Sequence, residues 1–371
     1  MVDLKSQYEK IKPDVDKAIQ FVIDNTQFIK GDAVKEFENE LATYLGVKHV
    51  IGCANGTDAL QIAMMALGLK PGDEVITTNF TFIATVEVIA LLGLKPILVD
   101  VYPDTYNINI NELKKAISPK TKAIVPVHLF GQCAHMESLM EIAKQHNLFV
   151  IEDNAQAIGA DYTFSSGITK KAGTIGHIGC TSFFPSKNLG CYGDGGALFT
   201  NDDELAEQIA SIVNHGMKKR YYHDRIGVNS RLDTIQAAIL RIKLPKLDEY
   251  ILARQEVASY YTKAFQEIAE IDTPKIDSFT SHVFHQYTMR IKGGKREALK
   301  SFLESKNVPA MIYYPVPLHT QKAFLEFKDD RDFPITEELC NEVLSLPMHT
   351  ELDEEQLTYI TNSVIEFFEN N

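Results

Sequence analysis

The chain has 371 residues, of which 45% are hydrophobic and 23% charged, proportions that are ordinary for a globular protein with a sizeable core. Its 37 basic and 50 acidic side chains give a net charge of −13, which argues against a protein that coats nucleic acid or an anionic membrane. No run approaches the ~20 apolar residues of a membrane span, and the N-terminus lacks the apolar core of a signal peptide. We therefore expect a cytoplasmic protein with two or three domains, or with one large and one small domain.

The five cysteines are odd in number and scattered along the chain. None of them forms a C-x-x-C pair, so the sequence suggests neither a zinc site nor a disulfide framework. We expect no metal site.

Residues 1–45 have apolar positions at helical spacing, interrupted by a predicted loop over residues 25–32. A short strand over residues 49–52 follows, and then a helix that starts near Gly56 and Thr57. Free N–H groups and the positive end of the helix dipole make this start a possible phosphate site. A plain N-cap by Asn55 or Thr57 is the alternative. The chain has no Walker pattern and no G-x-G-x-x-G, so ATP and Rossmann-type sites gain no motif support.

From there to about residue 200, short continuous apolar runs alternate with amphipathic helices. This pattern predicts an α/β fold with a mainly parallel sheet covered on both faces. In such sheets ligands bind at the carboxyl ends of the strands.

Asp153 lies at such a strand end, after the apolar residues 148–151. A buried carboxylate needs a partner, and a protonated ring nitrogen of a cofactor would serve. A metal, an arginine or a helix cap would also serve, so the residue alone does not decide. We interpret the neighbouring Glu152 as structural.

A glycine-rich stretch over residues 180–197 places Lys187 just after the aromatic pair Phe183 and Phe184. An amine in an apolar pocket loses hydration, which leaves a nucleophile that could form a Schiff base with an aldehyde or ketone. The glycines that follow let the backbone turn tightly and let a flat ligand approach. A surface lysine in a polar loop is the simpler alternative, and this stretch alone leaves both open.

Aromatic and histidine residues elsewhere give weaker signals. Phe80 and Phe82 follow a strand, where either could stack on an aromatic ligand or pack in the core. His215 and His223 flank the basic residues 218–220, which we interpret as a solvated face.

After Pro245 the alternation of apolar runs and amphipathic helices ends and a charged helix follows. We therefore predict a large domain over residues 1–245 and a small one over 246–371. The loop at residues 229–231 could face this subunit's site or a neighbour's. His282 and His285 alternate with apolar residues on a predicted strand, and we interpret them as surface or rim residues.

Five motifs, in the same order along nearly the whole chain, resemble those of the DegT/DnrJ/EryC1/StrS family of sugar-nucleotide aminotransferases: NGTDAL, FTFIAT, EDNAQAIGA, TSFFPSKNLGCYGDGG and NSRLDTIQAAIL. The resemblance implies a fold-type I, pyridoxal-phosphate-dependent homodimer with composite active sites. It also implies a large domain built on a mainly parallel, seven-stranded type of sheet, and a smaller α+β C-terminal domain.

By this resemblance, Lys187 matches the Schiff-base lysine, which also acts as base and acid in the proton shift. Asp153 matches the carboxylate that keeps the cofactor's pyridinium nitrogen protonated. Gln156 matches a residue that lies against the ring near its 3-hydroxyl, and Phe82 matches the aromatic that stacks on the other face.

The resemblance likewise assigns Gly56, Thr57 and Ser182 to the phosphate cup, and Asn229 to a phosphate contact supplied by the partner subunit. Relatives that remove a 3-hydroxyl have His in place of the lysine. Because Lys187 is present here, the resemblance favours amine transfer over dehydration.

Within the family, CANGTDALQI, SFFPSKNLGCYGDGGA, GVNSRLDTIQAAIL and SLPMH are most similar to enzymes that aminate C3 of UDP-2-acetamido-2-deoxy-3-oxo-glucuronate for surface polysaccharides such as O-antigen. Arg231, Tyr313 and Tyr314 match the residues that approach the sugar, although Tyr313 replaces a His of that relative. The planar fork of an arginine suits a uronate carboxylate. L-Glutamate is the expected amino donor, and 2-oxoglutarate its product.

Three other hypotheses stay open. The chain could be a dTDP-3-keto-6-deoxyhexose aminotransferase, a catalytically silent pyridoxal-phosphate-binding sensor of nucleotide sugars, or a purely structural α/β protein. Exchanging the substrate tests the first hypothesis, and the glutamate half-reaction tests the second. Lack of a bound chromophore would favour the third.

Overall fold

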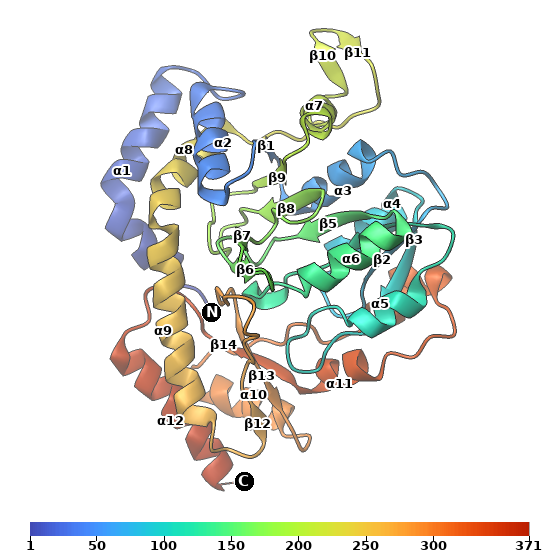
Figure 1. The fold of residues 1–371 in the computed structure, drawn as a ribbon. Coiled ribbons are helices and arrows are strands. Elements are labelled where there is room, and N and C mark those ends of the chain that lie inside the picture. Colours follow the sequence, from blue (N-terminus) through green and yellow to red (C-terminus); the bar gives the residue numbers. More distant parts are fainter. Residues whose placement is uncertain (371) are drawn as a thin grey trace.

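The computed structural model describes residues 1–370. Its centre is a seven-stranded sheet in the spatial order β1–β9–β8–β5–β4–β2–β3 (Figure 1). These strands are β1 (His49–Cys53), β2 (Glu74–Thr78), β3 (Lys95–Val99), β4 (Thr121–Val125), β5 (Phe149–Asp153), β8 (Ile178–Ser182) and β9 (Gly196–Thr200).

The sheet is mainly parallel, as predicted. The strands from β8 to β3 pair in parallel, whereas β9 runs antiparallel to both of its neighbours, β1 and β8. Every residue of β2, β8 and β9 is buried. Burial on both faces explains why these strands read as continuous apolar runs instead of alternating ones.

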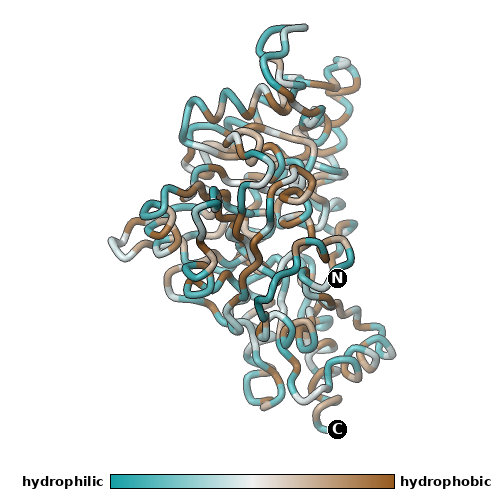
Figure 2. Tube along the Cα trace, turned by 90° about the vertical axis from the view of Figure 1, so that its right-hand side faces the viewer, coloured by the Kyte–Doolittle hydropathy of each residue, from teal (hydrophilic) through white to brown (hydrophobic). Residues whose placement is uncertain are grey.

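Helices cover both faces of the sheet. One face shares a core with α2 (Asp32–Leu45), α5 (Ile110–Ala116), α6 (Met136–His146) and α8 (Thr234–Lys243). The other face shares a core with α3 (Gly56–Ala66), α4 (Ala84–Leu91) and α7 (Asp203–Ile212). Figure 2 shows hydrophobic chain running through the middle of the molecule and hydrophilic chain along much of its outline.

The N-terminal helix α1 (Leu4–Asp24) lies against α8 through Ile11, Val15 and Ile239. Within residues 1–370, no helix is long and apolar enough to cross a membrane.

The long helix α9 (Leu247–Phe265) leads from the large sheet to a second core. That core contains an antiparallel three-stranded sheet in the order β12–β13–β14. Its elements are β12 (Ile271–Asp272), β13 (Tyr287–Ile291), α10 (Arg296–Ser305), α11 (Pro334–Glu342), β14 (Val343–Leu346) and α12 (Glu354–Asn370). The boundary predicted at residue 245 falls between α8 and α9 and stays a prediction.

The remaining elements are short: β6 (Asp161–Thr163), β7 (Thr169–Lys171), β10 (Met217–Lys219), β11 (Tyr222–His223) and the 3-10 helices η1 (Leu129–Gly131), η2 (Leu244–Lys246), η3 (Leu318–Thr320) and η4 (Lys322–Phe327). The β10–β11 hairpin projects from the body of the molecule (Figure 1). Its side chains are mostly exposed, as expected for the basic residues 218–220 and for His215 and His223.

One expectation about the small sheet is wrong. The strand predicted around residues 282–291 begins only at Tyr287, and His282 and His285 are buried instead of lying at the rim. The residues before the strand run against η1, where Val283 N–H donates to the Gly131 carbonyl at 2.9 Å. Both histidines are therefore enclosed by tertiary contacts that strand periodicity does not encode.

Candidate active site

Asp153, the last residue of β5, lies at the carboxyl edge of the large sheet and is only 5% exposed. Its carboxylate accepts hydrogen bonds from Thr85 Oγ1 at 2.8 Å and from the Ala155 N–H at 3.2 Å. Burial raises the pKa of Asp153, while these two hydrogen bonds and the charge of Lys187 oppose the shift. A cationic group bound nearby would keep this carboxylate ionised.

Lys187 lies in a closed loop that follows β8. The Lys187 N–H donates to the Phe184 carbonyl at 2.8 Å, and the Cys191 N–H returns to the Phe183 carbonyl at 2.8 Å. Burial lowers the pKa of Lys187 to about 8, against the attraction of the Asp153 carboxylate. Lys187 Nζ makes no hydrogen bond or ion pair with any other residue of the described chain, 1–370. It is therefore an unengaged amine with a raised fraction of its nucleophilic form.

Two residues that the sequence did not single out hold this loop. Lys243 Nζ of α8 donates to the Gly190 carbonyl at 2.8 Å, and Asn188 Nδ2 donates to the Val283 carbonyl at 2.9 Å. A lysine on an amphipathic helix and an asparagine in a polar loop give no signal of these contacts. Only the folded structure reveals these contacts, because the two partners are 53 positions apart in one hydrogen bond and 95 in the other.

The start of α3 offers backbone donors. The Asn55 side chain caps the Asp58 N–H at 2.8 Å, whereas no acceptor within residues 1–370 is bonded to the N–H groups of Gly56 and Thr57. Ser182, the last residue of β8, lies against this turn, and a Cβ added to Gly56 would come within 2.7 Å of Ser182 Cβ. Position 56 therefore requires glycine, because the backbone of α3 approaches Ser182 too closely for a side chain. The free N–H groups at this turn form a cradle suited to an anion.

Gln156 and Tyr314 meet although they are far apart in sequence. Gln156 Oε1 accepts from the Phe130 N–H at 2.7 Å, and Gln156 Nε2 donates to the Tyr314 hydroxyl at 3.2 Å. The ring of Phe82 lies 6.3 Å from that of Tyr314, and the ring of Tyr313 lies 6.0 Å from it. Phe82 is 54% exposed, whereas Phe80 belongs to the core. An aromatic side chain left open beside this polar pair is available to a flat ligand.

Asn229 and Arg231 lie on the surface and pair with each other. Arg231 Nε and Nη2 donate to Asn229 Oδ1 at 3.0 and 2.6 Å. Between them, Ser230 is buried, and its Oγ accepts from the Ala54 N–H at 3.0 Å. Within residues 1–370, no hydrogen bond joins Asn229 or Arg231 to Lys187, Asp153 or Gln156.

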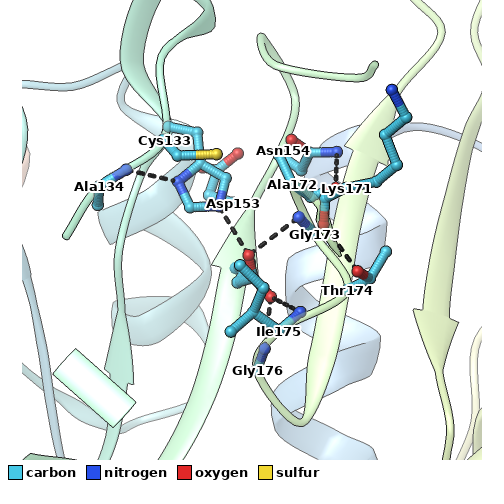
Figure 3. A network of polar contacts seen from close by, with 12 residues as sticks. Cys133, Ala134, Asp153, Asn154, Lys171, Ala172, Gly173, Thr174, Ile175 and Gly176 are labelled. Carbon is cyan, nitrogen blue, oxygen red and sulfur yellow. Dashed lines mark hydrogen bonds and ion pairs between the residues drawn. The ribbon is translucent and has the colours of Figure 1, made fainter. Parts of the chain in front are cut away.

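The carboxylate of Glu152, the residue before Asp153 on β5, is fixed by a network of donors, of which Gly173, Ile175 and Gly176 are labelled in Figure 3. It accepts from His128 Nε2 at 2.8 Å and from the N–H groups of Gly173 at 2.9 Å and Ile175 at 2.6 Å, as well as from Gly176. This arrangement agrees with the structural interpretation of Glu152.

The other ring nitrogen of His128, Nδ1, accepts from the Ala134 N–H at 3.2 Å. His128 is therefore neutral, with its proton on Nε2. Its backbone N–H donates to the carbonyl of Asp153 at 3.0 Å, so the network also secures the end of β5.

Comparison with known proteins places this geometry in context. Residues 9–365 match the model of the DegT/DnrJ/EryC1/StrS aminotransferase family. The chain is 49% identical to UDP-2-acetamido-2-deoxy-3-oxo-D-glucuronate aminotransferase of Pseudomonas aeruginosa, over 95% of each chain. It is 48% identical to the pleiotropic regulatory protein of Geobacillus stearothermophilus, over 99% of this chain and 98% of that one.

A solved structure of NtdA from Bacillus subtilis, with its cofactor PMP bound, matches with a TM-score of 0.89 and 31% identity. The match covers 97% of this chain and 82% of that one. Likeness to solved aminotransferases of this family confirms the predicted fold-type I architecture.

Proposed function

Because the chain belongs to the DegT/DnrJ/EryC1/StrS aminotransferase family, it is a pyridoxal-phosphate-dependent sugar aminotransferase, and we propose that it moves the amino group of L-glutamate to the C3 ketone of UDP-2-acetamido-2-deoxy-3-oxo-glucuronate. The observation that carries the chemistry is the unengaged amine of Lys187, whose pKa is lowered by desolvation, in the loop that follows β8 at the edge of the sheet where Asp153 ends β5. The choice of sugar is supported by the 49% identity to the P. aeruginosa enzyme.

The residues present fit the cofactor. The free N–H groups of Gly56 and Thr57, together with Ser182, form the cradle that would hold its phosphate. Asp153 is a buried carboxylate whose ionised form a cationic partner would stabilise, and a protonated pyridine nitrogen would be such a partner.

The remaining ring contacts come from two side chains. Gln156 would lie along one face of the ring, and the exposed Phe82 would stack on the other face. When bound, pyridoxal phosphate supplies the electron sink that makes the α-proton of an amino acid removable.

Lys187 is the residue that would hold the cofactor covalently between turnovers. Once the amine of glutamate takes its place, Lys187 Nζ would accept the α-proton of glutamate and deliver it to the cofactor carbon that becomes the amine carbon, and in the second half-reaction it would take a proton from that carbon and deliver it to C3 of the sugar. A pKa near 8 suits both roles, because it lies close to a neutral working pH.

We assign Arg231, Tyr313 and Tyr314 to the sugar, with Arg231 facing the uronate carboxylate. Asn229 and Arg231 would reach the site of a partner subunit in a homodimer, since within residues 1–370 they make no hydrogen bond to Lys187 or Asp153 of their own chain. Large apolar side chains left exposed, Phe184 in the lysine loop and Ile226 after β11, support a surface that a second subunit covers.

A second candidate is a cofactor-binding sensor without turnover. It is favoured by the regulatory name of the G. stearothermophilus relative, which is almost as similar to this chain as the P. aeruginosa enzyme. The glutamate half-reaction separates the two, because a silent sensor would leave the cofactor absorbance unchanged when glutamate is added.

The deciding experiment is the reverse half-reaction, followed by the cofactor absorbance. Protein in the pyridoxal form is mixed with the UDP-linked 2-acetamido-3-amino-glucuronate in one tube and with a dTDP-3-amino-6-deoxyhexose in another. We expect bleaching of the yellow form only by the uronate, and none in Lys187→Ala. Bleaching only by the deoxyhexose would retain the chemistry and replace the substrate. A third tube receives glutamate. If neither amino sugar nor glutamate bleached the yellow form, the result would contradict the proposal.

A further inference from the structure

His285 is a buried histidine in the segment that is hydrogen-bonded to the loop of Lys187, and none of the roles above uses it. It is 8% exposed and precedes β13 in the second core. A Cβ added to Gly131 would come within 3.1 Å of the His285 backbone nitrogen, and the following residue, Gln286, donates to the Phe130 carbonyl at 3.4 Å. Phe130 is the residue whose N–H binds Gln156. His285 therefore lies against the wall of the site.

The same segment is tied to the lysine loop. Asn188, the residue after Lys187, donates its side-chain N–H to the Val283 carbonyl at 2.9 Å. Arg254 of α9 fixes the segment from the other side, donating to the carbonyls of Phe284 at 3.2 Å and His285 at 3.4 Å. The backbones that carry Lys187 and His285 are thus held in a constant relation to each other.

Both side chains lack a partner. His285 Nδ1 is buried and has no hydrogen-bond partner among the described residues, and Lys187 Nζ has none either. An unpaired polar atom in the interior costs free energy, so a buried acceptor without a donor is unusual. The two groups are not bonded to each other in this structure, but the four rotatable bonds of a lysine side chain allow Nζ to move.

The charges around His285 keep its imidazole neutral. Burial lowers the pKa of His285 well below its ordinary value, and the positive charges of Lys187 and Arg254 add to this shift. The imidazole is therefore neutral at physiological pH and offers one nitrogen lone pair. The carboxylate of Asp153 is the acidic group that acts on Lys187 itself.

We propose that His285 is a positioning residue for Lys187, whose unpaired ring nitrogen accepts a hydrogen bond from the Lys187 amine whenever that amine is released from the cofactor. The released amine then has a fixed place from which to take and return protons, instead of being disordered in the pocket. The inference rests on the proposed role of Lys187, but it concerns the amine and not the sugar, so it is independent of the substrate.

The test uses cofactor-free protein and measures the pKa of Lys187 from the pH dependence of its reductive methylation by formaldehyde and borohydride, read by peptide mass spectrometry. A neutral acceptor stabilises the ammonium form, so removing it in His285→Phe should lower the pKa of Lys187 by about one unit. His285→Gln keeps an acceptor and should leave the pKa close to that of the wild type.

His282→Asn is the matched control. His282 lies in the same buried segment, its Nδ1 accepts from the Phe284 N–H at 3.0 Å, and burial alone accounts for its lowered pKa. Asparagine can keep that hydrogen bond, so the pKa of Lys187 should not change. If His285→Phe does not fold, His285→Met is the second apolar variant, and thermal melting verifies each protein.

An unchanged pKa of Lys187 in a folded apolar variant would overturn the proposal, as would an equal decrease in His285→Gln. Because no sugar is used, a failed substrate assignment in the reverse half-reaction would leave this measurement intact. If Lys187 proved unnecessary for the glutamate half-reaction, the inference about His285 would lose its premise.

Discussion

Two lysines with the same lowered pKa differ in whether their amines have partners. Burial lowers the pKa of both Lys187 and Lys243 to about 8. Lys243 Nζ is nevertheless satisfied, because it donates to the Gly190 carbonyl at 2.8 Å and to Gln7 Oε1 at 3.1 Å. Lys187 has the same shift without the partners. The shift in pKa therefore does not separate the two lysines, whereas the missing partner of Lys187 does.

The burial of Lys187 should reduce stability in a way that depends on pH. Below pH 8 the amine is protonated in both the folded and unfolded states, and the folded state bears the cost of the buried charge. Between pH 8 and 10.5 the folded state has released the proton that the unfolded state still holds, so wild-type stability rises with pH. We expect cofactor-free Lys187→Met to be more stable than wild type by about 1–3 kcal/mol near neutral pH, with the gap closing near pH ~10.

Thermal melting of both proteins across this pH range checks the expectation. Lys17→Met is the control, because Lys17 is exposed and should give the same melting temperature as wild type at every pH. A Lys187→Met protein that melted below wild type near neutral pH would show that the buried amine has partners that the structure does not contain.

At the scale of elements, the end of β5 depends on the network around Glu152. Burial alone would raise the pKa of Glu152, but hydrogen bonds from His128 and from the N–H groups of Gly176 and Gly173 hold it below its ordinary value. The carboxylate joins β5 to the turn over residues 173–176 and to the segment after β4 (Figure 3). All of its partners are donors, which only an ionised carboxylate can satisfy.

Glu152→Gln should destabilise the protein by about 3 kcal/mol, because the amide places its own N–H groups against these donors. Since the folded-state pKa is lowered, the contribution of Glu152 is present above its unfolded pKa and is lost as the pH falls through the folded value. Urea denaturation at neutral and acidic pH measures both effects. Glu207→Gln is the control, because Glu207 is exposed and forms a surface ion pair with Lys218, and it should cause no measurable change.

Several of these elements could be predicted from the sequence, and the reason is local. The strand that ends at Asp153, the helix that starts at Gly56 and the loop around Lys187 each have their pattern within one short segment. The hydrogen bond between Gln156 and Tyr314 joins residues 158 positions apart, and no local pattern encodes it. The burial of His285 has no local pattern for the same reason, because the segment around it contacts η1, the lysine loop and α9. Periodicity reports which face of an element is apolar, but not which other element covers it.

At the scale of the whole molecule, we expect the proposed site to draw on two chains. The amine, the phosphate cradle and the ring contacts come together at one edge of the sheet, whereas Asn229 and Arg231 point outward and bond to each other. If a homodimer forms, each subunit can give these two side chains to its partner. Complementation between inactive variants tests this arrangement directly.

Lys187→Ala and Asn229→Asp should each be inactive, the first because the amine is gone and the second because a carboxylate repels the cofactor phosphate. If Asn229 acts in the partner's site, a mixed dimer of the two variants contains one site with both defects and one site with none. Random pairing makes half of the dimers mixed, so ~25% of wild-type activity should return after co-expression. If Asn229 acts in its own subunit, every site of the mixed dimer carries one defect, and co-expression should restore nothing. Differently tagged subunits allow the mixed dimer to be purified, and its activity per cofactor distinguishes the two arrangements. The glutamate half-reaction suffices as the assay, so the result does not depend on which nucleotide sugar is the natural substrate.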